Sequence, residues 1–168
     1  MLSFRDLTKD DIDVRVAMCR EDGCSLLLYK DARCDMAILD ETVGAMNWQR
    51  EHSRANANCI VSMWDSEKGQ WVSKEDTGTE SQTEKEKGQA SDSFKRACFN
   101  WGIGRELYTS PFIWISKEKC EIKKRPNGTF ATPDKFIVEK IKIDNKRIVG
   151  LSIINLKSKQ RVFVWQAQ

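Results

Sequence analysis

Histidine, proline and paired cysteines are scarce in this sequence. Its 168 residues contain a single histidine, His52, and three prolines. The six cysteines include no Cys-x-x-Cys pair, whereas zinc sites usually show closely spaced Cys or His ligands. We therefore expect no metal centre and interpret the cysteines as buried, reduced thiols. With His52 as the only imidazole and no Gly-x-Ser-x-Gly turn, the usual hydrolase arrangements are also absent.

Long apolar runs and nucleotide-binding loops are missing too. No segment has the length of apolar residues that spans a bilayer, and residues 1–6 lack the apolar core of a secretory signal. No Gly-x-x-x-x-Gly-Lys-Ser/Thr loop is present to hold the phosphates of ATP. These absences predict a cytosolic protein with no membrane partner and no cofactor.

Charge is unevenly distributed along the chain. The sequence is 40% hydrophobic and 32% charged, which is ordinary for a soluble globular domain. Residues 117–161 carry 13 Lys and Arg against 5 Asp and Glu, a net charge of +8, while the rest of the chain carries −5. A basic C-terminal third favours a polyanionic partner, but a solvated, lysine-rich sheet would have the same composition.

Hydrophobic periodicity and turn residues predict many strands and two helices. A short helix is expected over 32–43, ended by Gly44, and a long helix over about 84–101, ended by Gly102. The segment 123–133 is expected to be an exposed turn or a mobile loop. Strands are predicted over 14–19, 24–29, 47–52, 59–64, 70–77, 112–115, 136–143, 147–156 and 161–165.

The order of these elements predicts an α+β fold. The closely spaced strands before the long helix favour an antiparallel β-meander with that one helix packed on it. The strands after the helix predict a second, basic β-meander. We therefore expect a core over residues 1–110 and a basic, β-rich C-terminal extension over residues 111–168 that packs on the core or continues it.

The long helix has two contrasting faces. Lys95, Arg96 and Phe99 project from the side opposite an apolar stripe, because successive helical residues are about 100° apart. Cations suit a phosphate backbone, and an aromatic ring can stack on an unpaired base. This face is a candidate nucleic-acid interface, although the outer face of any amphipathic helix carries solvated charges. The apolar stripe consists of Ala90, Phe94, Ala97, Cys98 and Trp101.

Three further cations complete the candidate DNA-binding set. Lys30 and Arg33 flank the first strand-to-helix corner, and Arg105 follows the long helix. The nearby Gly102-Ile-Gly104 follows a helix rather than a strand, so we interpret it as a helix cap and turn and not as part of a dinucleotide-binding loop.

An acidic cluster is the strongest candidate for an enzyme active site in this sequence. Glu75, Asp76 and Glu80 could hold Mg²⁺ for a nuclease, since carboxylates are the ligands of two-metal sites. The cluster also lies where a predicted strand ends and a loop begins, a common place for solvated acids. A metal-dependent nuclease therefore stays an alternative function.

Four short motifs follow one another within residues 24–108. The first is Asp40-Glu-x-x-Gly44, followed by Trp48, and the next two are Glu75-Asp76-x-Gly78 and Glu84-Lys-x-Lys87. The fourth is Ser91-Asp92-x-Phe94-Lys95-Arg96-Ala97, followed by Trp101-Gly102. In this order and spacing they resemble the Rad-type single-strand annealing proteins, a family that includes phage Sak-type recombination proteins and the eukaryotic double-strand-break repair annealer.

The resemblance implies a β-β-β-α core that assembles into homo-oligomeric rings or helical filaments. It implies ATP-independent annealing of complementary DNA strands in recombination and double-strand-break repair, with a single-strand-binding protein as a further partner and the host cytoplasm as the location of a phage-encoded member. By matching positions, Lys95, Arg96 and Arg33 would line a groove for single-stranded DNA. Phe99 stands where eukaryotic members carry a further Arg, which favours a stacking contact there. A protein that coats single strands without annealing them would share this surface.

Overall fold

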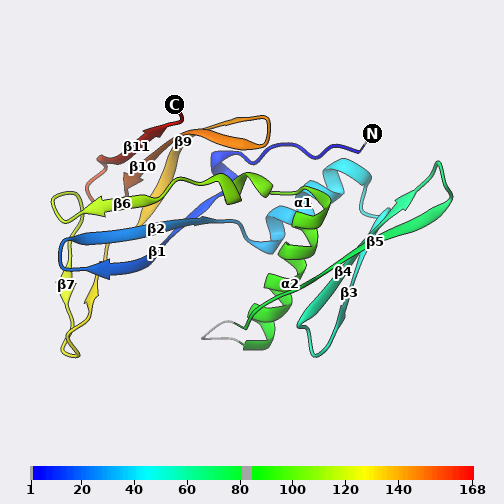
Figure 1. The fold of residues 1–168 in the computed structure, drawn as a ribbon, viewed down its shortest axis with the longest axis horizontal. Coiled ribbons are helices and arrows are strands. Elements are labelled where there is room, and N and C mark those ends of the chain that lie inside the picture. Colours follow the sequence, from blue (N-terminus) through cyan, green and yellow to red (C-terminus); the bar gives the residue numbers. More distant parts are fainter. Residues whose placement is uncertain (1, 81–84) are drawn as a thin grey trace. The chain divides into compact units, whose positions relative to one another are not determined.

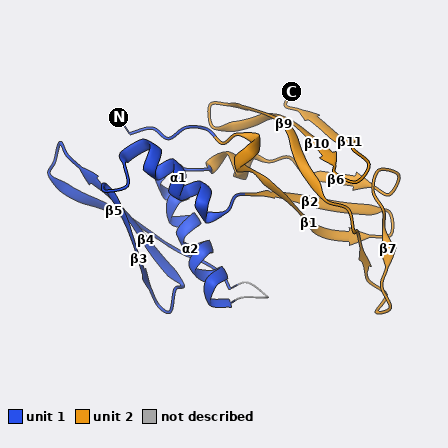
Figure 2. Ribbon diagram, turned by 180° about the vertical axis from the view of Figure 1, so that it is seen from behind, with its two compact units in different colours: residues 1–6, 30–104 blue, residues 7–29, 105–168 orange. Residues whose placement is uncertain are grey.

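The computed structural model describes residues 2–80 and 85–168, which fall into two compact units (Figures 1 and 2). Unit 1 comprises residues 1–6 and 30–104, and unit 2 comprises residues 7–29 and 105–168. This partition differs from a division at residue 110, because the segment 7–29 belongs with the C-terminal residues.

Unit 1 consists of a three-stranded antiparallel sheet and two helices (Figure 1). The strand order is β3-β4-β5, α2 contacts β4 and β5, and α1 contacts α2 and β3. The elements are α1 (Ala32–Val43), β3 (Trp48–Ser53), β4 (Asn58–Asp65), β5 (Gln70–Thr77) and α2 (Lys85–Trp101).

The predicted helix ends are confirmed where the structure describes them. The Asp31 carboxylate accepts hydrogen bonds from the backbone amides of Arg33 and Cys34 at 2.8 and 3.1 Å, which caps the first turn of α1. Gly44, at φ +84°, ends this helix. Gly102 directly follows α2, whereas Glu84, the predicted start of that helix, lies outside the described residues.

Packing of α2 against the sheet forms the core of unit 1. The Trp101 indole N–H donates to the Val61 carbonyl at 2.9 Å, and the Trp48 ring stacks on Phe94 with centroids 6.1 Å apart. The predicted apolar stripe thus faces the core. The buried apolar side chains that β4 and α2 contribute are Cys59, Val61 and Met63 of β4 and Phe94, Ala97 and Cys98 of α2.

The end of β5 approaches α2 so closely that only glycine fits. A Cβ atom on Gly78 would lie 2.3 Å from the backbone nitrogen of Ser93, and the Gly78 amide donates to the Ala57 carbonyl at 2.7 Å. The next residue, Thr79, donates its backbone amide to the Asp92 carboxylate at 2.8 Å. These contacts fix where the chain leaves the sheet relative to the middle of α2.

Unit 2 contains a six-stranded antiparallel sheet in the order β11-β10-β9-β1-β2-β6. Its edge strands β6 and β11 contact each other, so the sheet is nearly closed. A pairing between Asp13 and Ile137 joins the N-terminal hairpin to the C-terminal strands. The strands are β1 (Asp13–Arg20), β2 (Gly23–Tyr29), β6 (Ile113–Ser116), β9 (Phe136–Asp144), β10 (Arg147–Asn155) and β11 (Arg161–Gln166), with short 3₁₀ turns η1 (Lys9–Asp11) and η2 (Arg105–Thr109).

The predicted α+β class is therefore wrong for the chain as a whole. Strands make up 42% of the structure. The expected meander before the long helix is present as β3-β4-β5, but the C-terminal strands and the first hairpin form one nearly closed sheet. The individual strands were recognisable because period-2 alternation is local. Besides its hairpin partner β2, β1 pairs with β9, about 120 residues away in the sequence, and no local pattern encodes that second pairing.

The predicted loop over 123–133 is also corrected. It contains a separate two-stranded sheet, formed by β7 (Lys123–Lys124) and β8 (Phe130–Ala131). Within the described parts of the chain, no helix is both long and apolar enough to cross a membrane.

We predict that Gly78→Ala destabilises the protein by about 1–3 kcal/mol, because the new methyl group forces β5 and α2 apart. Urea unfolding measures this change. Gly150→Ala is the matched control, since a Cβ there meets Lys142 Cβ at 3.4 Å, an ordinary contact. Equal effects of the two substitutions would refute the steric account of Gly78.

Candidate nucleic-acid interface

The outer side of α2 presents two cations and an aromatic ring. Phe94, Ala97 and Cys98 are fully buried, while Lys95, Arg96 and Phe99 are half-buried on the rest of the helix. We call these last three residues the α2 face. Their geometry follows from the helical repeat, as the sequence suggested.

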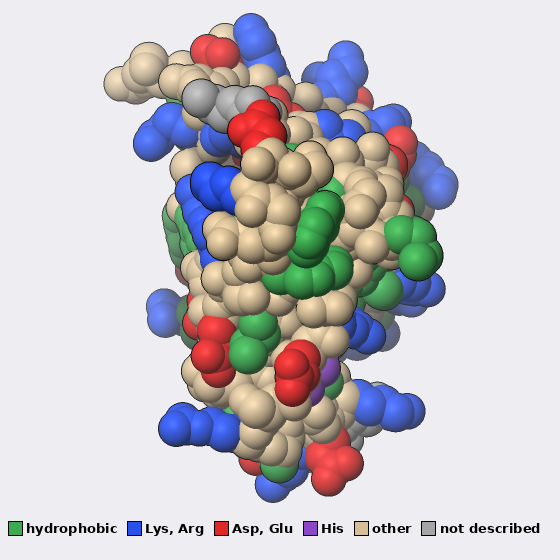
Figure 3. Space-filling model, turned by 90° about the vertical axis from the view of Figure 1, so that its right-hand side faces the viewer, with side chains coloured by type: hydrophobic (Ala, Val, Ile, Leu, Met, Phe, Trp, Pro, Cys, Tyr) green, Lys and Arg blue, Asp and Glu red, His purple; other side chains and the backbone are tan. Residues whose placement is uncertain are grey.

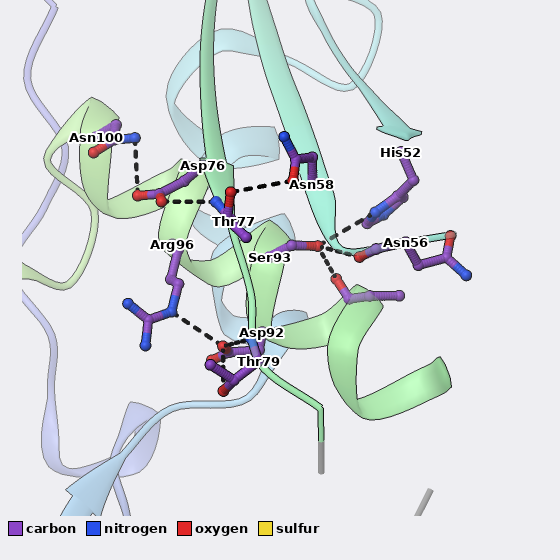
Figure 4. Close-up of polar contacts among 11 residues, drawn as sticks. His52, Asn56, Asn58, Asp76, Thr77, Thr79, Asp92, Ser93, Arg96 and Asn100 are labelled. Carbon is purple, nitrogen blue, oxygen red and sulfur yellow. Dashed lines mark hydrogen bonds and ion pairs between the residues drawn. The ribbon is translucent and has the colours of Figure 1, made fainter. Parts of the chain in front are cut away.

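Arg96 is held in place by an acid one turn earlier. Its Nε donates to the Asp92 carboxylate at 3.0 Å, and the Arg96 side chain is 43% exposed (Figure 4). Burial opposes ionisation of Asp92, but the Thr79 amide and Arg96 outweigh it and hold the pKa of this carboxyl below its ordinary value. Asp92 therefore orients the guanidinium and lowers the net positive charge of the α2 face.

The first turn of α1 adds a third cation, Arg33. Asp35 of α1 interacts electrostatically with Lys95 of α2, which places these two stretches close together. Arg33 lies two residues before Asp35, and its side chain is 87% exposed. Its guanidinium donates a hydrogen bond to the Asp31 carboxylate at 2.9 Å. Arg33, Lys95 and Arg96 are thus three partly or largely exposed cations of unit 1 that a phosphate chain could contact.

Lys30 does not belong to this surface. It is 1% exposed, its ammonium forms an ion pair with Asp35, and it lies 4.3 Å from the centroid of the Phe99 ring. We therefore remove Lys30 from the predicted phosphate contacts. Because the ammonium occupies one side of Phe99, a base cannot stack on that side of the ring.

Gly104 makes room for the buried lysine. A Cβ atom on Gly104 would lie 2.2 Å from Lys30 Cε, and its φ is +73°. Gly104, the second glycine of Gly102-Ile-Gly104, is therefore required for the packing of Lys30. Arg105, the next residue, is exposed at the start of η2 in unit 2, and we leave it outside the interface.

Asp35 is the counter-charge of Lys30 and is fully buried. Burial raises its pKa to about 6, although Lys30 and Lys95 favour the charged form. One of its oxygens, Oδ2, has no hydrogen-bond partner among the described residues. The pair is thus a costly arrangement that other packing in unit 1 must outweigh.

The acidic cluster is divided among different partners. Asp76 accepts a hydrogen bond from the Asn100 side-chain amide at 3.1 Å (Figure 4). Glu75 accepts one from the Asn58 side-chain amide at 2.7 Å, and Glu80 pairs with Lys85 at 3.8 Å. Over residues 2–80 and 85–168, no three His, Cys, Asp or Glu side chains are grouped to hold a metal ion. Glu75 and Asp76 therefore link β5 to β4 and α2 through hydrogen bonds.

His52 lies near a serine without forming an activated nucleophile. Its Nδ1 is 3.4 Å from the Ser93 hydroxyl, which is buried and lies within hydrogen-bond reach of the Asn56 and Ala90 carbonyls (Figure 4). Burial and the nearby Arg50 lower the pKa of His52. The serine therefore ties α2 to the β3–β4 turn.

Two cations that sequence reasoning missed flank α2. The Arg50 guanidinium lies 4.7 Å from the Phe94 ring centroid, and Lys74 Nζ lies 4.8 Å from that of Trp101. Both occupy the positions of β3 and β5 that pair with Val61, on the α2 side of the sheet. Strand alternation could have placed them there, but only once the register was known.

The opposite side of this sheet carries exposed aromatics. Trp64 and Trp71 pair across β4 and β5, with centroids 5.6 Å apart, and are 40% and 41% exposed. In Figure 3 hydrophobic side chains gather near the middle of the view, and charged side chains are scattered around them.

Comparisons with known proteins found no match: no family model, no curated protein and no solved structure is significantly similar to this chain.

We predict that Lys30→Met and Asp35→Asn each destabilise the protein by about 3–5 kcal/mol, because each leaves one buried group without its counter-charge. The double variant should recover at least half of that loss. Urea unfolding of all four proteins completes this double-mutant cycle. Additive losses in the double variant would show that the two side chains do not act as a pair.

Proposed function

We propose that this protein binds single-stranded DNA through the α2 face and Arg33 and anneals complementary strands without ATP. The main support for the proposal is the position of Lys95 and Arg96 on the outer side of α2. The inner side of this helix is buried against the sheet and offers no surface for a ligand. The motif resemblance points in the same direction. Its residues Gly78 and Asp92 make the contacts that hold this helix in place.

The chemistry is non-covalent. Lys95, Arg96 and Arg33 neutralise phosphates, and displacement of condensed counterions supplies most of the binding free energy. A strand held by its backbone keeps its base edges available for pairing with a second coated strand. Phe99 offers at most one side of its ring for stacking, since Lys30 covers the other.

We extend the proposal to a homo-oligomeric ring or helical filament. Within the described residues, β3 and β5 are the edge strands of the three-stranded sheet, and each has a free edge. Edge strands can pair with a neighbouring copy through their backbone groups. A row of copies would align successive α2 faces along one DNA strand.

The test is the rate at which two labelled complementary oligonucleotides pair at rising protein concentration, without nucleotide and with a chelator present. Acceleration above the spontaneous rate supports annealing. Binding combined with slowed pairing would instead identify a protein that coats and protects single strands. Loss of labelled strands on addition of Mg²⁺ or Mn²⁺ would favour the nuclease.

We predict that Lys95→Ala and Arg96→Ala each weaken single-strand binding several-fold for every sequence tested. Each should also reduce the slope of log affinity against log salt by about 0.7, the value expected for one lost phosphate contact on a single strand. Fluorescence anisotropy across a salt series measures both quantities.

Lys68→Ala is the matched control, because Lys68 is an exposed lysine of unit 1 that pairs with Asp65 in the β4–β5 turn, away from α2. Arg96→Lys keeps the charge and should retain most of the slope. An unchanged salt slope in both alanine variants would refute the assignment of the α2 face.

A further inference from the structure

Unit 2, and not unit 1, holds the excess positive charge. Unit 2 has 17 Lys and Arg against 11 Asp and Glu, a net charge of +6, whereas unit 1 has 11 against 14, a net charge of −3. The α2 face is therefore a local cationic site on a net acidic unit. Over longer range, a polyanion is attracted to unit 2.

The most concentrated cations of unit 2 lie on the β7–β8 ribbon. Residues 123–131 contain three consecutive cations, Lys123, Lys124 and Arg125, and no acidic residue. All three are exposed. The ribbon forms its own sheet and projects from the rest of unit 2, seen in yellow in Figure 1.

The tip of the ribbon is tightly structured. The Arg125 amide donates to the Thr129 carbonyl at 2.7 Å, and the Gly128 amide donates back to the Arg125 carbonyl at 2.9 Å. The Asn127 side chain accepts from the Thr129 hydroxyl at 2.6 Å, and Gly128 adopts φ +85°. Cations on such a preorganised turn lose little backbone entropy on binding.

Nearby carboxylates neutralise only part of the positive charge on the ribbon. Glu121 pairs with Lys123 at 3.2 Å and with Lys157 at 2.5 Å. Among the ion pairs of the described residues, none includes Lys124 or Arg125. Because side chains alternate along a strand, Lys123 and Lys124 lie on opposite faces of β7, and Arg125 follows directly at the start of the turn. Both faces therefore carry a cation.

We propose that the β7–β8 ribbon binds double-stranded DNA through its phosphate backbone, with Lys124 and Arg125 as the principal contacts. A two-stranded ribbon fits the major groove, which is about 12 Å wide, and cations on both faces can reach the phosphates on its two sides. A single strand is the less suitable ligand, since the only aromatic residue of the ribbon, Phe130, is half-buried. That this duplex is the product of annealing rests on the proposed function; the binding itself does not.

The experiment compares binding of a labelled duplex and a labelled single strand by the full-length protein and by Lys124→Ala/Arg125→Ala. We expect the double variant to lose duplex affinity on the order of tenfold and to reduce the duplex salt slope by about 0.9 for each phosphate contact removed. Its affinity for the single strand should stay within about twofold. Lys124→Arg/Arg125→Lys keeps both charges and should bind the duplex like the wild type.

Lys9→Ala/Arg20→Ala is the matched control, since it removes two exposed cations of unit 2 outside the ribbon. Unchanged duplex affinity in the ribbon variant, or an equal loss in this control, would overturn the proposal. So would ribbon-dependent binding to anionic phospholipid vesicles with no binding to the duplex. Ribbon-dependent duplex binding by a protein that binds no single strands would uphold the ribbon assignment and refute the proposed annealing function.

Discussion

The contact between the end of β5 and the middle of α2 determines how unit 1 presents its long helix. At Gly78 the two backbones approach so closely that no side chain can intervene, and one residue later Asp92 binds the Thr79 amide. Asp92 also orients Arg96, so the same carboxylate that fixes the chain path positions a cation of the α2 face. The inner side of the helix meanwhile packs on β4 through Phe94 and Ala97. The orientation of the α2 face is thus a direct consequence of how the helix is anchored.

The buried Lys30–Asp35 pair imposes a second constraint on the same surface. It removes one predicted phosphate contact from solvent and covers one side of Phe99. Asp35 also lies within electrostatic reach of Lys95, which it partly offsets. Together with Asp92, it leaves the α2 face less cationic than its sequence suggests. Binding through a weakly cationic face is strengthened when many copies act on one strand, which is consistent with the proposed oligomer.

The two units differ in net charge, and the difference matches the two forms of DNA in our proposals. Unit 1 carries a small cluster of cations on an acidic background, whereas unit 2 is basic and carries a rigid, cationic ribbon. In our proposals, the first contacts single strands before pairing and the second contacts the duplex. Because the two proposed sites share no residue, the proposals predict that the two activities can be separated by mutation.

Much of the local structure was readable from the chain. The apolar period over 32–43, Gly44 and the apolar stripe ending at Trp101 predicted both helices, since a 3.6-residue period and a glycine cap act within a few residues. The alternation along 136–143 likewise predicted β9. The outward position of Lys95, Arg96 and Phe99 followed from the same periodicity.

Long-range contacts decided the rest. Pairing of Asp13 with Ile137 created the nearly closed sheet and made the α+β expectation wrong, and a tertiary contact buried Lys30 against Asp35, Phe99 and Gly104. The segment 123–133 predicts a turn or loop from its sequence, because the two paired steps of the ribbon within it are too short to show alternation. Local sequence therefore specified which residues form helices and strands and which way their faces turn. Which strands became neighbours, and which cations stayed in solvent, depended on packing between residues far apart in the chain, for which the sequence carries no local signal.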